Sequence, residues 1–73
     1  MMGIATYMVT IRMFDELYPC AYFFNDPGLA NRFYYEKREF YKENSLFTGT
    51  QVQLWTLSAD GKAWNLKLSS DNA

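Results

Sequence analysis

The 73-residue sequence contains no histidine and only one cysteine, Cys20. The absence of histidine excludes Ser-His and Cys-His catalytic pairs and removes the imidazole ligands that zinc commonly uses. With one cysteine the chain can form no internal disulfide, which favours a reducing compartment. We therefore expect a cytoplasmic protein that needs neither a metal ion nor a cofactor.

The sequence also lacks an excess of charge and a long hydrophobic run. Seven Lys and Arg residues offset eight Asp and Glu residues, giving a net charge of −1 that provides no general attraction for nucleic acid phosphates. The longest apolar run, Cys20 to Phe24, is too short to span a bilayer, and no basic residue precedes Arg12. The sequence predicts neither a membrane span nor a signal peptide.

Catalytic constellations are missing as well. The neighbours of Cys20 are apolar and would not lower the pKa of its thiol, so we expect a buried small hydrophobic residue there. Asp15 and Glu16 are adjacent carboxylates with no companion ligands, which is typical of a solvated turn. The four glycines are scattered and complete no phosphate-binding loop. We predict that the protein is not an enzyme; a reactive Cys20 or a carboxylate pair is the remaining catalytic alternative.

Aromatic residues are abundant, at 19% of the chain, and 49% of all residues are hydrophobic. At this length we expect one domain, residues 1–73, because two separate cores would each be too small to fold unaided. A domain of about this size buries only about 60% of the surface that its unfolded chain exposes. The aromatic surplus is therefore predicted to face another molecule.

Two strands are predicted in the first third of the chain. Ile4 to Phe14 alternates with a period of two, with its odd positions directed toward the core. Asp15-Glu16 interrupts this pattern, and Tyr18 to Phe24 is rich in aromatic residues, which favours a second, antiparallel strand. Pro19 cannot donate a hydrogen bond, so it indicates an edge strand or a strand start.

A helix is predicted from Pro27 to Glu43, because this stretch contains no β-branched residue. Asn25 or Asp26 can cap its first amides, and Pro27 suits the first turn. We expect Asn44-Ser45 to end it. Its core-facing stripe is predicted to comprise Leu29, Ala30, Phe33, Tyr34, Phe40 and Tyr41.

The last third of the chain predicts a hairpin. Asp60-Gly61 is a strong turn signal between the strands Gln51 to Leu57 and Lys62 to Leu68, because Gly61 accepts a positive φ. This turn brings Leu57 opposite Trp64 and Trp55 opposite Leu66. We expect the polar tail, 69–73, to be frayed.

These elements give the order ββαββ and predict an α+β fold, in which a small antiparallel sheet has one helix packed on one face. We expect the helix to cover the face formed by Tyr7, Val9, Ile11, Trp55, Leu57, Trp64, Leu66 and Leu68. Met8, Val52 and Leu54 would then remain on the uncovered face as an apolar patch.

Two surfaces are candidates for partner binding. The first is a helix flank with the Tyr and Arg composition of interface hot spots, Tyr34, Tyr35, Arg38, Tyr41 and Lys42. Its structural alternative is that Tyr34 and Tyr41 border the core while Arg38 and Lys42 are simply solvated. The second is the uncovered sheet face with Met8 and Leu54; scattered, tolerated apolar residues are the alternative there.

The sequence thus predicts a non-catalytic module for protein–protein interaction, which self-associates as a homodimer through the sheet or is covered by a protein partner. No family is recognised from the residues, but short proteins of this layout are common among phage-encoded accessory proteins, many of which act by occluding a host protein, so an inhibitor is one form that we expect this function to take. The alternative is a single-strand nucleic-acid-binding protein that stacks bases on Tyr22, Phe24 or Tyr35, with little basic charge to support it.

Overall fold

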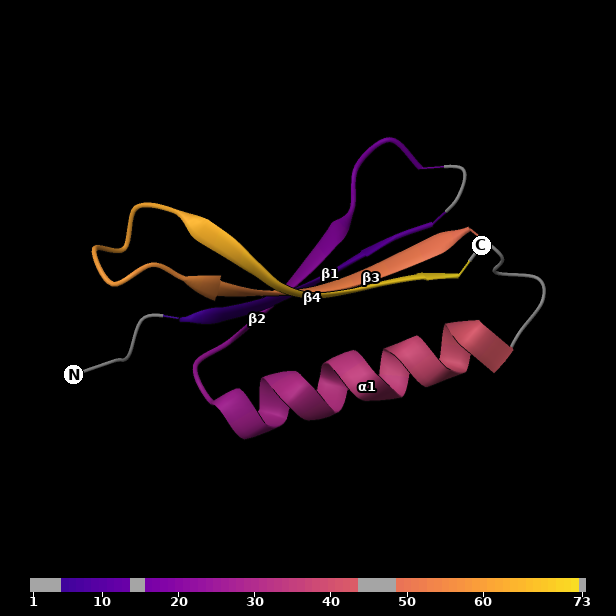
Figure 1. Cartoon of the computed structure of the whole chain (residues 1–73), viewed down its shortest axis with the longest axis horizontal. Coiled ribbons are helices and arrows are strands. Elements are labelled where there is room, and N and C mark those ends of the chain that lie inside the picture. Colours follow the sequence, from indigo (N-terminus) through magenta and orange to yellow (C-terminus); the bar gives the residue numbers. More distant parts are fainter. Residues whose placement is uncertain (1–4, 14–15, 44–48, 73) are drawn as a thin grey trace.

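The structure is a computed structural model that describes residues 5–13, 16–43 and 49–72. Four strands form one antiparallel sheet in the spatial order β2-β1-β3-β4, and the helix packs against one of its faces (Figure 1). This arrangement confirms the predicted α+β fold. In chain order the elements are β1 (Tyr7–Arg12), β2 (Cys20–Phe24), α1 (Pro27–Glu43), β3 (Thr50–Leu57) and β4 (Trp64–Asn72).

The start of α1 is fixed by one side chain. The Asp26 carboxylate accepts a hydrogen bond of 2.9 Å from the backbone N–H of Leu29, which satisfies an amide that the helix itself cannot pair. Pro27 follows as the first helical residue, where its missing N–H costs nothing. The described bounds of α1 match the predicted ones, and the expected end at Asn44-Ser45 lies outside the described residues.

The turn between β3 and β4 adopts the predicted hairpin geometry. Gly61 has a φ of +73°, and the backbone N–H of Ser58 donates to the carbonyl of Ala63 at 2.8 Å. The Asp60 carboxylate accepts hydrogen bonds from the Ser58 hydroxyl and from the Lys62 N–H. These contacts hold the predicted register, in which Leu57 pairs with Trp64 and Trp55 pairs with Leu66.

The predicted fraying of the C-terminal tail is wrong for residues 69–72. β4 continues to Asn72, which pairs with Thr50 at the start of β3. The tail is polar, but its backbone hydrogen bonds to β3 do not depend on side-chain hydrophobicity. On the other side of the sheet, β2 is an edge strand that begins directly after Pro19, as predicted.

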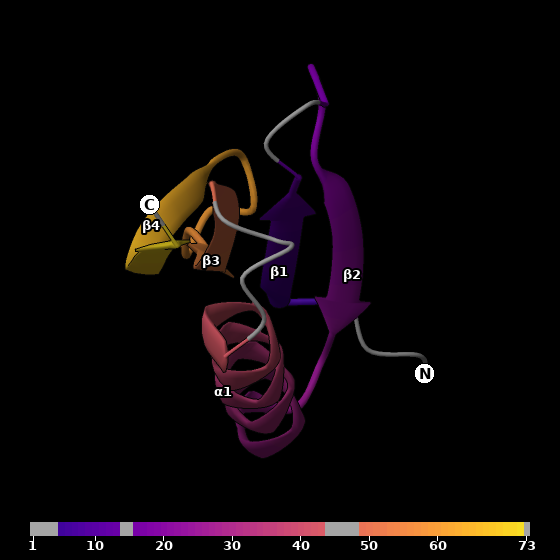
Figure 2. The ribbon, with the colours of Figure 1, turned by 90° about the vertical axis from the view of Figure 1, so that its right-hand side faces the viewer.

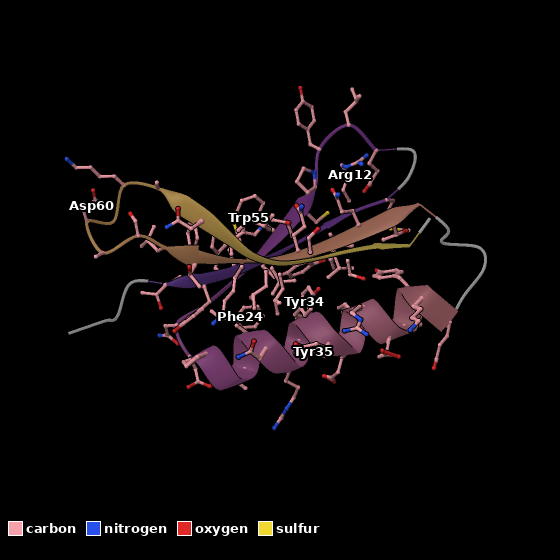
Figure 3. All side chains as sticks on the ribbon, viewed as in Figure 1. Arg12, Phe24, Tyr34, Tyr35, Trp55 and Asp60 are labelled. Carbon is pink, nitrogen blue, oxygen red and sulfur yellow. The ribbon has the colours of Figure 1, made fainter. Side chains whose placement is uncertain are left out.

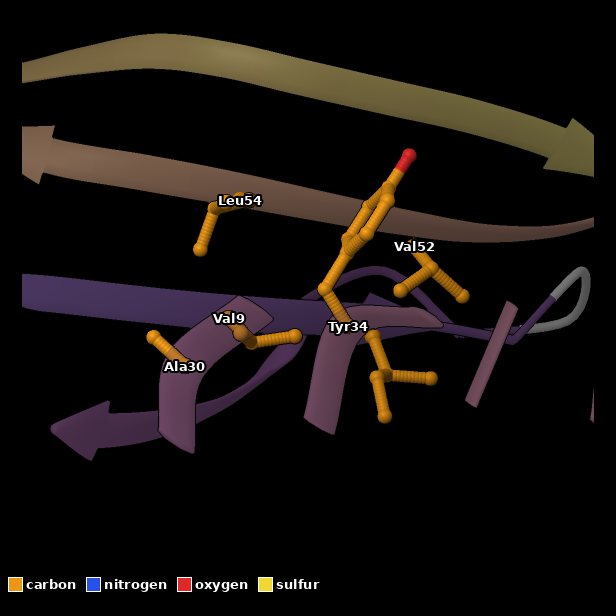
Figure 4. Packing of buried hydrophobic residues seen from close by; sticks show 6 residues of the cluster. Val9, Ala30, Tyr34, Val52 and Leu54 are labelled. Atoms are coloured by element: carbon orange, nitrogen blue, oxygen red, sulfur yellow. The ribbon is translucent and has the colours of Figure 1, made fainter. Parts of the chain in front are cut away.

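The core lies between α1 and the two inner strands. Val9 and Ile11 from β1 and Val52 and Leu54 from β3 meet Ala30 and Tyr34 from α1 (Figure 4). Leu54 is 1% exposed and Tyr34 is 3% exposed. The two inner strands supply the sheet's part of the core because α1 lies beneath β3 and β1, whereas β2 lies at the outer edge of the sheet (Figure 2).

The prediction that Trp55 and Leu57 of β3 face the helix is wrong, because the two faces of β3 are exchanged relative to the expected arrangement. β1 and β3 pair Val9 with Leu54 and Ile11 with Val52, so the even positions of β3 share the helix-facing side with the odd positions of β1. Trp55 and Leu57 therefore lie on the face away from α1, and Figure 3 shows Trp55 on that side. Each face of β3 carries two large apolar side chains, Val52 and Leu54 on one and Trp55 and Leu57 on the other, so the alternation alone could not decide between them.

A bulge divides the residues of β4 that were predicted to share one face. Leu68 pairs with Leu54, whereas Leu66 pairs with Trp55, so Lys67 is an extra residue opposite the junction of Leu54 and Trp55. Leu68 consequently packs against the core. Leu66 lies on the opposite face with Trp55.

Three further residues expected in the core are exposed. Leu29 and Phe40 of α1 are at the surface rather than in the core-facing stripe, and Cys20 is exposed rather than buried. The cause is the position of α1 beneath β1 and β3 (Figure 2), because the helix contacts the edge strand β2 through Phe33 but does not cover it completely.

Shortening a core residue tests the helix-facing side of β3. We expect Leu54→Ala to lower the free energy of unfolding by about 2–5 kcal/mol, because it removes buried methyl groups and leaves a cavity. Leu66→Ala is the matched control: Leu66 is 51% exposed on the other face, and its loss should cost less than about 1 kcal/mol. Urea unfolding of both variants measures the difference, and equal losses would contradict the assignment of faces.

The hairpin turn predicts an acid-sensitive contact. The hydrogen bond from the Ser58 hydroxyl, followed by that from the Lys62 N–H, lowers the pKa of Asp60. A depressed pKa in the folded state means that the stabilisation is present above the unfolded value, about 3.9, and is lost as the pH falls through the folded value. We expect the Lys62 amide resonance to titrate in this acidic range in the wild type and to stay constant in Asp60→Asn. A Lys62 shift that titrates equally in both proteins would contradict the contact.

Candidate interaction surfaces

The face of the sheet opposite α1 carries a cluster of large apolar side chains. Met8 pairs across strands with both Phe23 and Trp55, which places all three on this side. Trp55 in turn pairs with Leu66, and Leu57 pairs with Trp64. We call this cluster the open face; it comprises Met8, Phe23, Trp55, Leu57, Trp64 and Leu66.

The side chains of the open face are held by contacts among themselves. The rings of Phe23 and Trp64 come from the two edge strands and lie 6.0 Å apart between centroids, so they approach each other over the inner strands. The Trp55 indole N–H donates to the Thr10 hydroxyl at 3.0 Å, and Thr10 is buried although no helix covers it. The open face is therefore a preformed surface, which lowers the entropy that binding must cost.

The open face is uncharged, and polar groups border it at one end. Gln53 donates a side-chain hydrogen bond to Ser69 beside Thr10, and Arg12 follows on the same side (Figure 3). Phe23 is 58% exposed and Leu66 is 51% exposed at the apolar end. An apolar centre with a polar border is the usual composition of a protein–protein interface.

The predicted helix flank is only partly a surface. Tyr35 is exposed, and the Arg38 guanidinium lies over its ring, 5.6 Å from the centroid. Arg38 also approaches the Glu39 carboxylate to 3.6 Å, and Lys42 is exposed one turn further on. Arg38 therefore already interacts with Tyr35 and Glu39 on the helix, so a new contact with a partner would add less binding energy.

Two of the predicted binding residues are unavailable to a partner. Tyr34 and Leu54 are buried between α1 and the sheet, so both are corrected from surface to core. Tyr34 is buried because its position on α1 points between β1 and β3, as the alternative for the helix flank predicted. Leu54 is buried because β3 presents its even positions to the helix. Met8 does lie on the uncovered side, as predicted.

Tyr41 belongs to neither surface. It packs against the core cluster and touches Phe40, with 5.1 Å between ring centroids. Burial raises the pKa of the Tyr41 phenol, and the neighbouring Tyr22, Cys20 and Glu16 raise it further. These neighbours place the phenol on the β2 side of the helix, away from Tyr35.

The predicted binding residues omit four members of the open face, Phe23, Trp55, Trp64 and Leu66. One signal could have identified the two tryptophans, because tryptophan is rarely buried completely whereas valine and leucine often are. On β3 this preference would have directed Val52 and Leu54 into the core and Trp55 outward. Nothing in the sequence indicates that Phe23 rather than Phe24 faces away from the helix; Phe24 instead contacts Phe33 at 5.2 Å.

The described part of the chain shows no grouping of three or more side chains that could bind a metal ion. Glu16 serves its turn, since its carboxylate accepts a hydrogen bond from the Met13 N–H, and Asp15 lies outside the described residues. Within the described residues, no helix is both long and apolar enough to cross a membrane. Comparison with protein-family models, with curated proteins and with solved structures finds no match.

Burial of Tyr34 makes a prediction at alkaline pH. Desolvation is the main cause that raises its pKa, opposed by the positive charge of Arg38. Because the pKa of Tyr34 is higher in the folded state than in the unfolded state, the neutral phenol contributes its full share of stability below the unfolded value, about 10. This contribution is lost as the pH rises through the folded value. Tyr34→Phe should therefore unfold at higher pH than the wild type in a circular dichroism titration. Tyr18→Phe, at an exposed position, is the control; identical midpoints for the two variants would contradict the assignment.

Proposed function

We propose that the chain is a non-catalytic protein-binding module that uses the open face to cover a surface of another protein. The observation that carries the proposal is the position of both tryptophans, Trp55 and Trp64, on the side of the sheet that α1 leaves uncovered. Aromatic residues dominate the energetics of protein interfaces because they bury a large area with few rotatable bonds. An inhibitor of the kind found among phage accessory proteins is the form of this function that the layout favours.

Three properties of the open face support this proposal. Its side chains are already ordered by the contact of Phe23 with Trp64 and by the hydrogen bond of Trp55 to Thr10. It is apolar at its centre, and Arg12, Gln53 and Ser69 supply polar groups at one border. None of the side chains that form it belongs to the core cluster between α1 and the sheet, so a partner can cover them without displacing that cluster.

Nucleic-acid binding is the competing function, because exposed rings on a sheet can stack bases. Of the proposed stacking residues, Phe24 is half-buried against Phe33, while Tyr22 and Tyr35 lie on different sides of the helix. Arg12 is the one cationic residue on β1, β2 and β3, and Lys67 is the one on the described part of β4, so the strands that form the open face provide little attraction for a phosphate backbone. Protein binding is therefore favoured over base stacking.

A comparison of three proteins tests the proposed function. Leu66→Lys replaces an exposed residue of the open face, and Tyr35→Lys replaces an exposed residue of the helix flank. The wild type retains both residues. We expect a protein partner captured by the wild type to be lost with Leu66→Lys and retained with Tyr35→Lys. The captured protein is then purified, and direct binding is followed by the change in tryptophan fluorescence.

The competing outcomes are separable. Loss of the partner with Tyr35→Lys but not with Leu66→Lys would assign binding to the helix flank and contradict the proposal. Titration with single-stranded oligothymidylate at low salt should leave the tryptophan fluorescence unchanged. Quenching that disappears steeply as salt is added would instead support nucleic-acid binding.

A further inference from the structure

The edge strand β2 is short and follows Pro19, but within its length it lacks the charges and bulges that keep many edge strands from pairing with another strand. Alternate residues of an edge strand direct their backbone N–H and C=O groups away from the sheet. β2 has the sequence Cys20-Ala21-Tyr22-Phe23-Phe24, with no charged side chain, no proline within the strand and no bulge in its pairing with β1. The opposite edge differs, because β4 carries a bulge at Lys67, and bulges and lysines are the usual protection of sheet edges.

Exposed apolar side chains gather around β2. Of the eight large hydrophobic residues that are exposed in the described part of the chain, six lie on β2, directly before it or on the adjoining flank of α1. Leu29 and Phe40 belong to this flank because they lie one and two helical turns from Phe33, which contacts Tyr22 at 5.0 Å. The six are Leu17, Tyr18, Tyr22, Phe23, Leu29 and Phe40.

The small and large side chains of β2 match each other in size when two copies of the strand pair antiparallel. If two copies of β2 pair antiparallel about Tyr22, Cys20 lies opposite Phe24 on the helix side, and Ala21 lies opposite Phe23 on the other side. Each large ring then faces a small residue, and the two Tyr22 side chains face each other. No like charges are brought together, because β2 carries none. A strand from an unrelated protein would have no reason to match this order of small and large residues.

We propose that two copies of this chain join through their β2 strands, in antiparallel register about Tyr22, to form one continuous eight-stranded sheet. A twofold axis perpendicular to the sheet places both α1 helices on one side, with their Leu29 and Phe40 flanks directed toward the shared β2 pair. The two open faces become neighbours on the other side. The dimer thus leaves the proposed partner surface accessible, and it does not depend on the proposed function.

Sedimentation equilibrium of the full chain, from about 1 µM to about 1 mM, tests the dimer. We expect a reversible monomer–dimer equilibrium in the wild type. Tyr22→Lys should weaken it by about tenfold or more, because two ammonium groups would lie directly opposite each other. Tyr22 is 43% exposed, so the variant keeps its core, and its circular dichroism spectrum should match that of the wild type. Leu66→Lys is the matched control on the open face and should dimerise like the wild type.

Cross-linking tests the register. In the proposed dimer, residue 22 faces its own copy, whereas the two Cys20 residues are four positions apart along the strand, about 13 Å, which is too far for a disulfide. Tyr22→Cys combined with Cys20→Ser should therefore form a disulfide-linked dimer on oxidation before the native chain does through Cys20. Leu66→Cys combined with Cys20→Ser controls for random collisions and should react no faster than the native chain.

Several results would overturn the β2 dimer. A wild type that stays monomeric up to the highest concentration would do so, as would a dimer that survives Tyr22→Lys. Dissociation by Leu66→Lys alone would place self-association on the open face instead. Cross-linking through Cys20 as fast as through the engineered cysteine at position 22 would contradict the register.

Loss of partner capture by Leu66→Lys with the dimer intact would support both proposals, since partner binding and self-association are tested with different variants.

Discussion

The pairing of β1 with β3 at the centre of the sheet is the constraint on which the other features of this protein depend. Val9 lies beside Leu54 and Ile11 beside Val52, so that four aliphatic side chains from two inner strands project to one side and meet Ala30 and Tyr34. A shift of one residue in this register would exchange the two faces of β3 completely. The tryptophans would then be buried under α1, and Val52 and Leu54 would face solvent.

This constraint also explains why the domain has apolar surface left over. α1 lies beneath β1 and β3 and covers the aliphatic side, so the rings of Phe23, Trp55 and Trp64 remain on the other side of the sheet. The same position of α1 leaves β2 uncovered, with Tyr22 and the flank of α1 beside it exposed. One helix therefore leaves two apolar surfaces, an open face and an unprotected edge, which meet at Phe23, and these are the surfaces to which we assign partner binding and self-association.

Much of the fold could be predicted from the sequence, because the signals involved are local. Asp26 and Pro27 determine where α1 begins, and Asp60-Gly61 determines the turn and the pairing of β3 with β4. The relative register of β1 and β3 could not be predicted, because these strands are joined through a strand and a helix and no turn fixes their alignment. For this reason Leu54 was assigned to the surface although it is a core residue, while Met8, which lies on β1, was placed correctly. Tyr34 is a core residue for a different reason, because it belongs to the core-facing stripe of α1. The bulge at Lys67 likewise has no signal in the hydrophobic pattern of β4.

Nuclear Overhauser effects from the Tyr34 ring test the central pairing most directly, since protons must lie within a few ångströms of each other to give them. The arrangement described here predicts strong effects from Tyr34 to the methyl groups of the aliphatic core residues, Leu54 among them, and none to the Trp55 indole. Effects from Tyr34 to the Trp55 indole, with Leu54 methyl groups distant from every α1 side chain, would show that β3 faces the other way and would contradict the account.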